Sequence, residues 1–304
     1  MKPPHDILSR IGNTPLVKVN FDSPASIFAK LEYLNPGGSI KDRSARYMIE
    51  LAERRGLLKP GGTIVEASSG NQGIALAMIG AIKGYRVVIT VSEKASEEKV
   101  NTIRGYGAEV VVCPAVDEYD DPRGYHKTAQ RLAREIHGAY MPDQHFNPSN
   151  VEAHYHSTGP EIWRQTEGML THFFAAAGTT GTISGVGKYL KAQNPAVRVL
   201  GVDAANSYFS TNGRPKPYAV EGLGIDHATP LLNLAAIDEM IPVTDTQAFG
   251  MLKTMVQKFG LLVGPSSGAV ASAVQEYAKR LTENDVAVFI VADSGRAYLT
   301  KGYY

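Results

Sequence analysis

The chain has 304 residues, about two average domains, because single domains usually contain roughly 100–200 residues. Hydrophobic residues make up 43% of it, and 31 Lys and Arg balance 30 Asp and Glu. This composition excludes a disordered or highly charged chain and argues against a nucleic-acid partner. The single cysteine, Cys113, excludes an intramolecular disulfide framework and a zinc site built from several cysteines.

The amino-terminal segment has no apolar run long enough for a signal peptide. No uncharged apolar stretch reaches the ~18 residues that suggest a membrane-spanning helix. We therefore expect a cytoplasmic protein without a membrane partner, and a reducing compartment suits its single thiol.

Apolar, β-branched runs alternate with segments of helical periodicity along most of the chain. The runs predict strands at Ile27–Leu31, Thr63–Ala67, Arg86–Val91, Glu109–Cys113, Phe173–Ala176, Arg198–Val202 and Val286–Val291. The periodic segments predict helices at Asp42–Arg55, Gly73–Lys83, Glu97–Tyr106, Tyr125–Ile136, Thr182–Gln193, Thr246–Phe259 and Ser267–Arg280. Such alternation predicts an α/β fold, with parallel sheets covered by helices on both faces.

The stretch Met141–Asn150 is irregular and rich in Pro, Asn and Asp, which predicts a junction between two α/β lobes. Ligands of open α/β sheets bind at the carboxyl ends of the strands. We therefore expect a binding site in a cleft between the lobes, walled by strand-to-helix loops.

The segment Asn35–Arg43 reads Asn-Pro-Gly-Gly-Ser-Ile-Lys-Asp-Arg and places Lys41 in the first turn of a predicted helix. Its tight turn leads to Ser39, a favourable residue for capping a helix N-terminus. The helix dipole opposes a cation at this end and so favours the neutral amine. Only a neutral amine attacks an aldehyde, which makes Lys41 a candidate Schiff-base lysine. A solvated surface lysine is the alternative interpretation of this segment alone.

A second motif, Glu66–Gly73, follows the predicted strand Thr63–Ala67 and reads Glu-Ala-Ser-Ser-Gly-Asn-Gln-Gly. Backbone N–H groups at a helix start bind an anion, and hydroxyl and amide side chains add donors. The loop is therefore a candidate site for a carboxylate. A cap and turn without a ligand explains the same residues equally well.

A third motif, Gly178–Thr182, contains only glycine and threonine and lies between an apolar strand and a helix. Small residues let backbone amides approach phosphate oxygens closely, so the loop predicts a phosphate site. Neither the P-loop pattern nor the dinucleotide-binding glycine pattern occurs around it, which disfavours an ATPase or a dinucleotide-dependent dehydrogenase. A tight glycine turn is the less favoured alternative.

The fourth motif, Gly264–Gly268, matches the Gly-x-Ser-x-Gly pattern of α/β-hydrolase nucleophiles. That fold needs a histidine after the serine, whereas the last histidine of this chain, His227, precedes Ser266. The hydrolase interpretation therefore fails. Ser266 remains as a hydroxyl at a helix start that can bind a heteroatom of a ligand.

Together and in this order, the four motifs resemble those of the cysteine synthase and cystathionine β-synthase family of pyridoxal-phosphate (PLP) enzymes. The resemblance runs from Ile11–Pro15 to Asp293–Gly295 and beyond. It implies PLP fold type II, similar to the tryptophan synthase β chain, with two doubly wound open sheets and flanking helices. It also implies a large phosphate-binding domain of residues 1–40 and 146–304, and a smaller, mobile domain of residues 41–145.

The resemblance assigns the cofactor contacts residue by residue. Lys41 matches the lysine that binds PLP covalently, and Asn71 matches the asparagine that contacts its 3-hydroxyl group. Ser266 matches the serine that faces the pyridine nitrogen. The implied phosphate loop comprises Gly178, Thr179, Thr180, Gly181 and Thr182.

The same resemblance assigns the substrate to the asparagine loop, a nearby glutamine and the stretch Glu221–Gly224. The implied substrate residues are Ser68, Ser69, Asn71, Gln72, Gln144 and Gly222. Two positions depart from the family pattern. Gln72 adds bulk where the family has threonine, and Thr180 occupies a position where glycine is usual. A positive φ angle would strain the backbone there.

The reaction implied by the resemblance is β-replacement on L-serine, O-acetyl-L-serine or O-phospho-L-serine through an aminoacrylate, with sulfide as nucleophile and L-cysteine as product. Homocysteine giving cystathionine and an amine giving a diaminopropionate-type product are the alternatives. A second hypothesis is a PLP-binding protein with little catalysis, in which Gln72 and Thr180 have degraded the site. The resemblance also implies a homodimer. No metal site is predicted, because His154 and His156 do not share a helix face.

Overall fold

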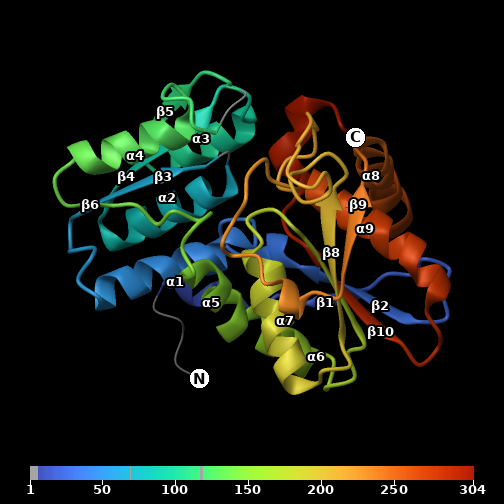
Figure 1. Cartoon of the computed structure of the whole chain (residues 1–304). Helices are drawn as coiled ribbons and strands as arrows, with labels where there is room; N and C mark the ends of the chain where they lie inside the picture. Colours follow the sequence, from blue (N-terminus) through green and yellow to red (C-terminus); the bar gives the residue numbers. More distant parts are fainter. Residues whose placement is uncertain (1–5, 69, 117–118) are drawn as a thin grey trace.

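The computed structural model describes residues 6–68, 70–116 and 119–304, which form two sheets with helices around and between them (Figure 1). The strands are β1 (Leu16–Lys18), β2 (Ser26–Leu31), β3 (Thr63–Ala67), β4 (Arg86–Ser92), β5 (Glu109–Cys113), β6 (Ala139–Tyr140), β7 (His172–Ala176), β8 (Arg198–Ala204), β9 (Glu239–Val243) and β10 (Val286–Val291). The α-helices are α1 (Lys41–Arg54), α2 (Asn71–Lys83), α3 (Glu97–Gly105), α4 (Tyr125–Glu135), α5 (Ser149–His156), α6 (Thr158–Gln165), α7 (Gly181–Gln193), α8 (Asp245–Phe259) and α9 (Pro265–Tyr277). A 3₁₀ segment, η5 (Gly295–Lys301), follows β10.

The larger sheet has the strand order β1-β2-β10-β7-β8-β9, and all neighbours except the antiparallel pair β1 and β2 are parallel. The inner strand β10 is apolar throughout and buried on both faces. Phe289 and Val291 pack towards α8 and α9, whereas Val288 and Ile290 pack towards α6 and α7. Successive side chains of β10 point to opposite faces of the sheet, and helices cover both faces. Nearly every position is therefore buried, which explains why this inner strand is a continuous apolar run.

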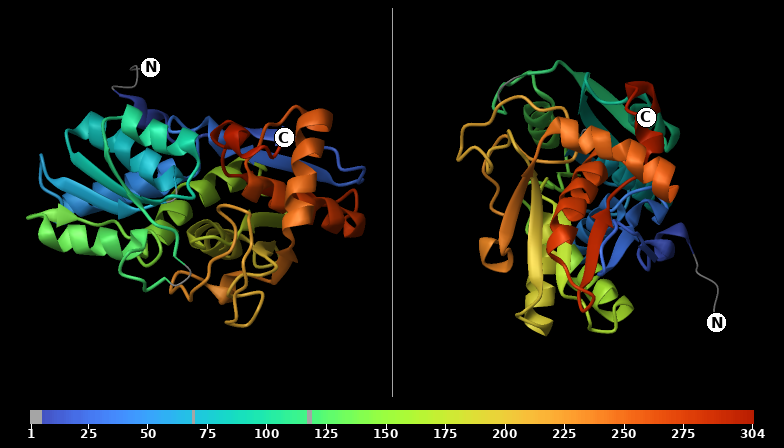
Figure 2. Two further views of the ribbon diagram at one scale, coloured as in Figure 1. Left: turned by 90° about the horizontal axis from the view of Figure 1, so that it is seen from above. Right: turned by 90° about the vertical axis from the view of Figure 1, so that its right-hand side faces the viewer.

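The smaller sheet has the order β5-β4-β3-β6, with all strands parallel. Helices α2 and α3 cover one face, where Ile64 packs, and α4 covers the other, where Val65 packs against Ala129. Helix α1 packs against α2 on one side and α5 on the other. It therefore lies between the two halves of the molecule, which stand side by side in Figure 1 and in the left view of Figure 2.

The predicted α/β class with two open, mainly parallel sheets and flanking helices is confirmed. Every predicted strand and helix is present, and the ends agree within a few residues. The sequence patterns do not predict β1, β6, β9, α5 or α6. The domain boundaries near residues 40 and 145 stay predictions.

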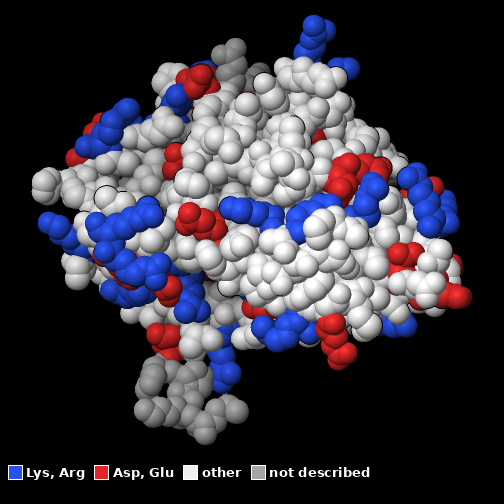
Figure 3. Space-filling view, turned by 60° about the horizontal axis from the view of Figure 1, so that its bottom comes forward, with Lys and Arg blue, Asp and Glu red and all other residues white. Residues whose placement is uncertain are grey.

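On the face seen in Figure 3, basic and acidic side chains lie intermixed, so this face has no large patch of only positive or only negative charge. Within the described ranges, none of the helices has the length and apolar character needed to cross a bilayer. Cys113 is buried at the end of β5, as expected of a small apolar side chain.

Candidate active site

A cavity of about 310 Å³ opens where loops that follow strands of both sheets meet. Most of the residues predicted from the motifs line it, although they lie far apart in the sequence. These are Lys41, Asn71, Gln144, Gly178, Thr179, Thr180, Thr182, Gly222 and Ser266. Ser68, Gln72 and Gly181 do not line the cavity, and Ser69 lies outside the described residues.

Lys41 is the first residue of α1, and its Nζ donates to Thr179 Oγ1 at 3.3 Å. The lysine and the glycine–threonine loop are therefore close enough for one small ligand to contact both. Ser39 Oγ accepts the Lys41 N–H at 3.2 Å and so supports the start of the helix. Burial lowers the pKa of the Lys41 amine to about 8, while Asp293 and Glu66 oppose the shift. The cause is desolvation of the ammonium form.

The loop Gly178–Thr182 joins β7 to α7 at the cavity wall. A Cβ at Gly178 would lie 2.8 Å from the carbonyl oxygen of Gly222, and a Cβ at Gly181 would collide with the amide of Asn150. Both glycines are therefore needed for close approach of neighbouring segments. Thr182 Oγ1 lies 3.2 Å from His154 Nε2, which fixes its hydroxyl at the helix start.

Thr180 has φ = 63°, the left-handed conformation that disfavours a β-branched residue. Its Oγ1 is buried and has no hydrogen-bond partner among the described residues. A buried hydroxyl without a partner is costly, so this atom is available to a ligand in the loop. The departure from glycine at this position therefore adds a donor and strains the backbone.

We expect Thr180→Gly to be more stable than Thr180→Ala by about 1 kcal/mol, because alanine keeps the strained φ angle and glycine removes it. Both variants lack the hydroxyl, so the comparison isolates the backbone. Urea unfolding of the two variants measures the difference. Alanine as the more stable residue, the usual order at negative φ, would contradict the strain.

Asn71 is the first residue of α2, and its Nδ2 donates to Asp293 Oδ2 at 2.6 Å. Tyr298, in η5, donates its hydroxyl to the same oxygen at 2.6 Å. Burial raises the pKa of Asp293, which lines the cavity with Tyr298 and Ser266. The motifs did not identify Asp293 and Tyr298 as site residues, because no local pattern links them to Asn71.

The remaining predicted substrate residues have other partners. Ser68 Oγ accepts the N–H groups of Gly70 and Gly73 at 3.1 and 3.0 Å, so its side chain supports the start of α2. Gln72 is buried behind the cavity wall, where its Oε1 accepts from Ser44 at 3.3 Å. Gln144 lines the cavity, and its Nε2 donates to a backbone carbonyl at 3.3 Å. Binding of substrate by these residues stays a prediction.

An aromatic vestibule forms the other part of the cavity, and the motifs did not identify it. Its residues are Tyr119, Tyr125, His126, His145, Asp226 and His227. Tyr119 comes from the loop before α4, and Tyr125 and His126 are the first two residues of α4. His145 comes from the segment before α5, and Asp226 and His227 come from the segment between β8 and β9. Two of its residues adjoin predicted ones in the sequence: the pair Asp226–His227 lies close after the Glu221–Gly224 stretch, and His145 directly follows Gln144. In the part of the chain that the structure describes, no group of three or more His, Cys, Asp or Glu can hold a metal ion.

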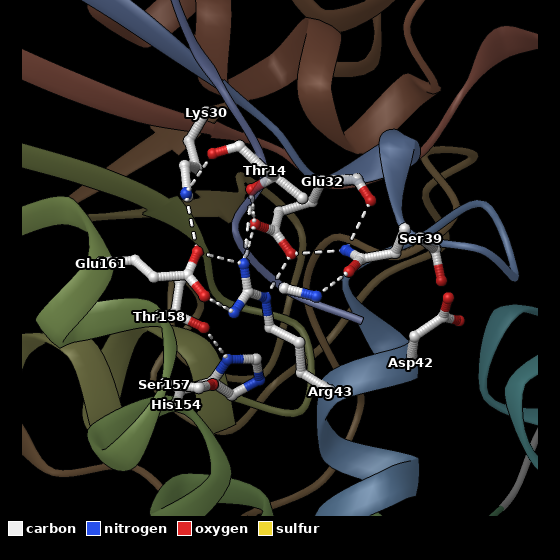
Figure 4. A network of polar contacts seen from close by, with 12 residues as sticks. Thr14, Lys30, Glu32, Ser39, Asp42, Arg43, His154, Ser157, Thr158 and Glu161 are labelled. Carbon is white, nitrogen blue, oxygen red and sulfur yellow. Dashed lines mark hydrogen bonds and ion pairs between the residues drawn. The ribbon is translucent and has the colours of Figure 1, made fainter. Parts of the chain in front are cut away.

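A buried ionic network holds the first turn of α1 (Figure 4). Arg43 donates to both oxygens of Glu32 at 2.7 and 2.8 Å and to both oxygens of Glu161 at 2.7 and 2.8 Å. Lys30 Nζ also donates to Glu161 at 2.9 Å. Burial opposes ionisation of Glu161, yet hydrogen bonds and charge from Arg43 lower its pKa to about 2. Because Arg43 follows Lys41 by two residues, the network positions the backbone of the lysine.

Comparisons with known proteins identify the family of this chain. The family described as pyridoxal-phosphate dependent enzyme matches residues 7–293. The chain belongs to this PLP-dependent family. It is 41% identical over 305 residues to a cystathionine β-synthase of Apis mellifera, covering 97% of this chain and 60% of that protein. It is 41% identical over 307 residues to a cysteine synthase of Staphylococcus aureus, covering 100% of this chain and 98% of that protein.

A solved structure agrees with the family assignment. The crystal structure of an O-acetylserine dependent cystathionine β-synthase from Helicobacter pylori has a TM-score of 0.92, at 36% identity over all of both chains. The resemblance stated from the motifs is therefore confirmed, and PLP is the cofactor of the family. The chain spans only about 60% of the Apis mellifera protein that it matches.

The described residues fit this cofactor. Lys41 offers an amine of lowered pKa, and the loop beside it offers the N-terminus of α7 and the unpartnered hydroxyl of Thr180. A helix N-terminus of this kind stabilises a phosphate. Ser266 and Asn71 supply hydroxyl and amide groups on the walls of the same cavity. The contacts between these residues and PLP are proposals, and we develop them below.

Proposed function

We propose that this chain catalyses PLP-dependent β-replacement on L-serine or on L-serine activated as its O-acetyl or O-phospho derivative, with sulfide giving L-cysteine. The observation that carries the proposal is the Lys41 amine, with its pKa lowered to about 8, within hydrogen-bond reach of Thr179 in the glycine–threonine loop. The end-to-end similarity to a cysteine synthase supports the same reaction.

Lys41, the glycine–threonine loop, Asn71 and Ser266 have distinct roles in this proposal. The loop Gly178–Thr182 would hold the phosphate, and Lys41 would hold the cofactor covalently and then take the α-proton of the amino acid. Asn71 and Ser266 would hydrogen-bond the ring substituent and the ring nitrogen. When bound, PLP supplies an electron sink for the α-carbon. The neutral hydroxyl of Ser266 stabilises a protonated ring nitrogen less than a carboxylate would, which favours β-elimination over transamination.

Homocysteine is the second candidate nucleophile, and it would give cystathionine. The Apis mellifera and Helicobacter pylori proteins are named cystathionine β-synthases, and the latter is described as O-acetylserine dependent. The vestibule, lined by Tyr119 and three histidines, is a compartment in which a nucleophile larger than sulfide can be recognised.

The test is a visible spectrum of the purified, PLP-loaded protein titrated with L-serine, O-acetyl-L-serine and O-phospho-L-serine. Product analysis with sulfide and with homocysteine follows for each donor. We expect a spectral shift with at least one donor and a new carbon–sulfur bond with at least one nucleophile. A spectrum that does not respond to any donor would instead favour the hypothesis of a PLP-binding protein.

We expect the rate at which PLP attaches to the apoenzyme to rise with pH and to level off above about pH 8. Only the neutral amine attacks the aldehyde, and burial lowers the pKa of Lys41 to about 8 from 10.5. Below that value the rate should increase about tenfold per pH unit. Stopped-flow absorbance across a pH series measures it. A rate that still increased steeply above pH 9 would mean that the amine keeps its ordinary pKa.

We also propose a cytoplasmic homodimer, in which the segment 41–145 moves as a smaller domain. The single, buried Cys113 suits a reducing compartment, and the family resemblance supports the dimer. Light scattering of the purified protein measures the oligomeric state, and a monomeric mass would contradict the dimer.

A further inference from the structure

Asp226 and His227 form a hydrogen-bonded pair at the vestibule of the cavity. His227 Nδ1 lies 2.9 Å from Asp226 Oδ1, and both residues line the cavity. The hydrogen bond lowers the pKa of Asp226, which is therefore ionised at neutral pH. An ionised carboxylate only accepts hydrogen bonds, so in the neutral imidazole Nδ1 carries the proton and Nε2 carries the lone pair.

The free nitrogen of His227 is available for a proton from a ligand. Nε2 is shielded from bulk water and has no hydrogen-bond partner among the residues that the structure describes. The imidazole is held between aromatic neighbours, with ring centroids 4.4 Å from Tyr119 and 5.8 Å from Phe146. A buried, unpartnered nitrogen on a ring oriented by a carboxylate is the arrangement that general bases share.

The other groups of the vestibule are poorer bases. Burial and the neighbouring His227 lower the pKa of His126 to about 4, and burial lowers the pKa of His145 well below its usual value. Burial raises the pKa of Tyr119 to about 12, so its hydroxyl keeps the proton. None of these three side chains has a carboxylate partner among the described hydrogen bonds. Such a partner stabilises the imidazolium that forms when Nε2 is protonated.

We propose that His227 Nε2 is the general base that takes the proton from the incoming nucleophile, a thiol or an amine, and that Asp226 is its positioning residue. This inference rests on the proposed β-replacement. Lys41 first removes the α-proton, and the electron pair left on the α-carbon becomes shared with the β-carbon as the leaving group departs as its anion. The nucleophile then gives its proton to His227 Nε2 and uses its own electron pair to form the new bond to the β-carbon. This addition returns the shared pair to the α-carbon, which regains the proton that Lys41 removed, and His227 releases its proton to water.

The proposal defines the class of nucleophile that the vestibule serves. A thiol of ordinary pKa is mostly protonated at neutral pH and gains from a base, whereas an anion without a proton gains nothing from it. Loss of His227 should therefore slow the two classes of nucleophile unequally. A residue that only shapes the vestibule would slow both equally.

The experiment uses the PLP-loaded His227→Gln variant and wild type, with O-acetyl-L-serine as donor. Two probes serve as nucleophiles at pH 7: 2-mercaptoethanol, which carries the proton, and azide, which does not. Both proteins should release acetate in the absence of a nucleophile, because this half-reaction takes no proton from a nucleophile. Addition of 2-mercaptoethanol should fall about 10²–10⁴-fold, and addition of azide should change less than about threefold. Equal losses with both probes, or no loss with the thiol, would overturn the proposal.

Two further variants sharpen the assignment. In Asp226→Asn, addition of 2-mercaptoethanol should likewise slow more than addition of azide. This variant changes which nitrogen of the imidazole carries the proton without removing the ring. His126→Gln is the matched histidine of the same vestibule, and any loss there should be equal for both probes. A loss in His126→Gln that affected 2-mercaptoethanol but not azide would show that His126, and not His227, is the base. Failure of wild type to release the leaving group from any of O-acetyl-L-serine, O-phospho-L-serine and L-serine contradicts the proposed function instead, and so the two ideas fail separately.

Discussion

Replacement of Lys41 by alanine should abolish covalent attachment of PLP and lower kcat of β-replacement by about 10²–10⁴-fold or more, the usual contribution of a positioned acid–base group. The same side chain is proposed to hold the cofactor and to take the α-proton, so the variant loses both contributions. Borohydride reduction followed by peptide mass analysis measures the attachment, and a steady-state assay with O-acetyl-L-serine and sulfide measures kcat.

Lys188→Ala is the matched control, because Lys188 is an exposed lysine on α7, the helix that follows the phosphate loop. This variant should be labelled at position 41 and keep wild-type kcat. Attachment of PLP to another lysine in Lys41→Ala, with full activity, would show that position 41 does not carry the cofactor.

Replacement of Arg43 by methionine should destabilise the protein by about 3–5 kcal/mol, the cost of leaving buried charges without their partner. The buried Arg43 pairs with Glu32, which is fully buried, and with Glu161. Among the described ion pairs, Glu32 would keep no cationic partner and Glu161 would keep only Lys30. Urea unfolding, at equal PLP content, measures the change. A loss below about 1 kcal/mol would mean that the network relaxes around the missing charge.

Arg46→Met provides the comparison on the same helix. Arg46 pairs with Glu50 four residues later, and the two side chains are 36% and 33% exposed. Half-exposed pairs of this kind contribute little, so we expect a loss below about 1 kcal/mol. The difference in destabilisation between the two variants shows how much of the effect depends on burial of the ion pair.

The sequence predicts the inner strands and the long helices because their patterns are strong. β10 is a six-residue apolar run, and α4 is an amphipathic segment between clear breaks. The missed elements lack such patterns. β9 contains Pro242, which is confined to edge strands, and β9 is indeed at the edge of its sheet. α6 contains Gly159 and Pro160 in its first turn, where proline is tolerated but the sequence suggests a break.

The motifs predict one part of the cavity, because each residue there belongs to a loop with a recognisable sequence pattern. Lys41, Thr179 and Ser266 are of this kind, and the fold brings them to one cavity. The vestibule is different, because no motif includes Tyr119 or His227, and the two side chains meet only in the folded chain. The partners of Arg43 are also unpredictable from spacing, since Glu161 lies 118 positions away.

The central position of β10 also bears on how the chain is made. β10 pairs with β2 on one side and with β7 on the other, so residues 286–291 complete a sheet that begins near residue 16. A ribosome must therefore synthesise most of the chain before the larger sheet can close. The smaller sheet uses only residues 63–140 and can form earlier. Until β10 is synthesised, one edge of β2 has no partner strand. An unpaired strand edge promotes aggregation, and a chaperone that binds the nascent chain would reduce this risk.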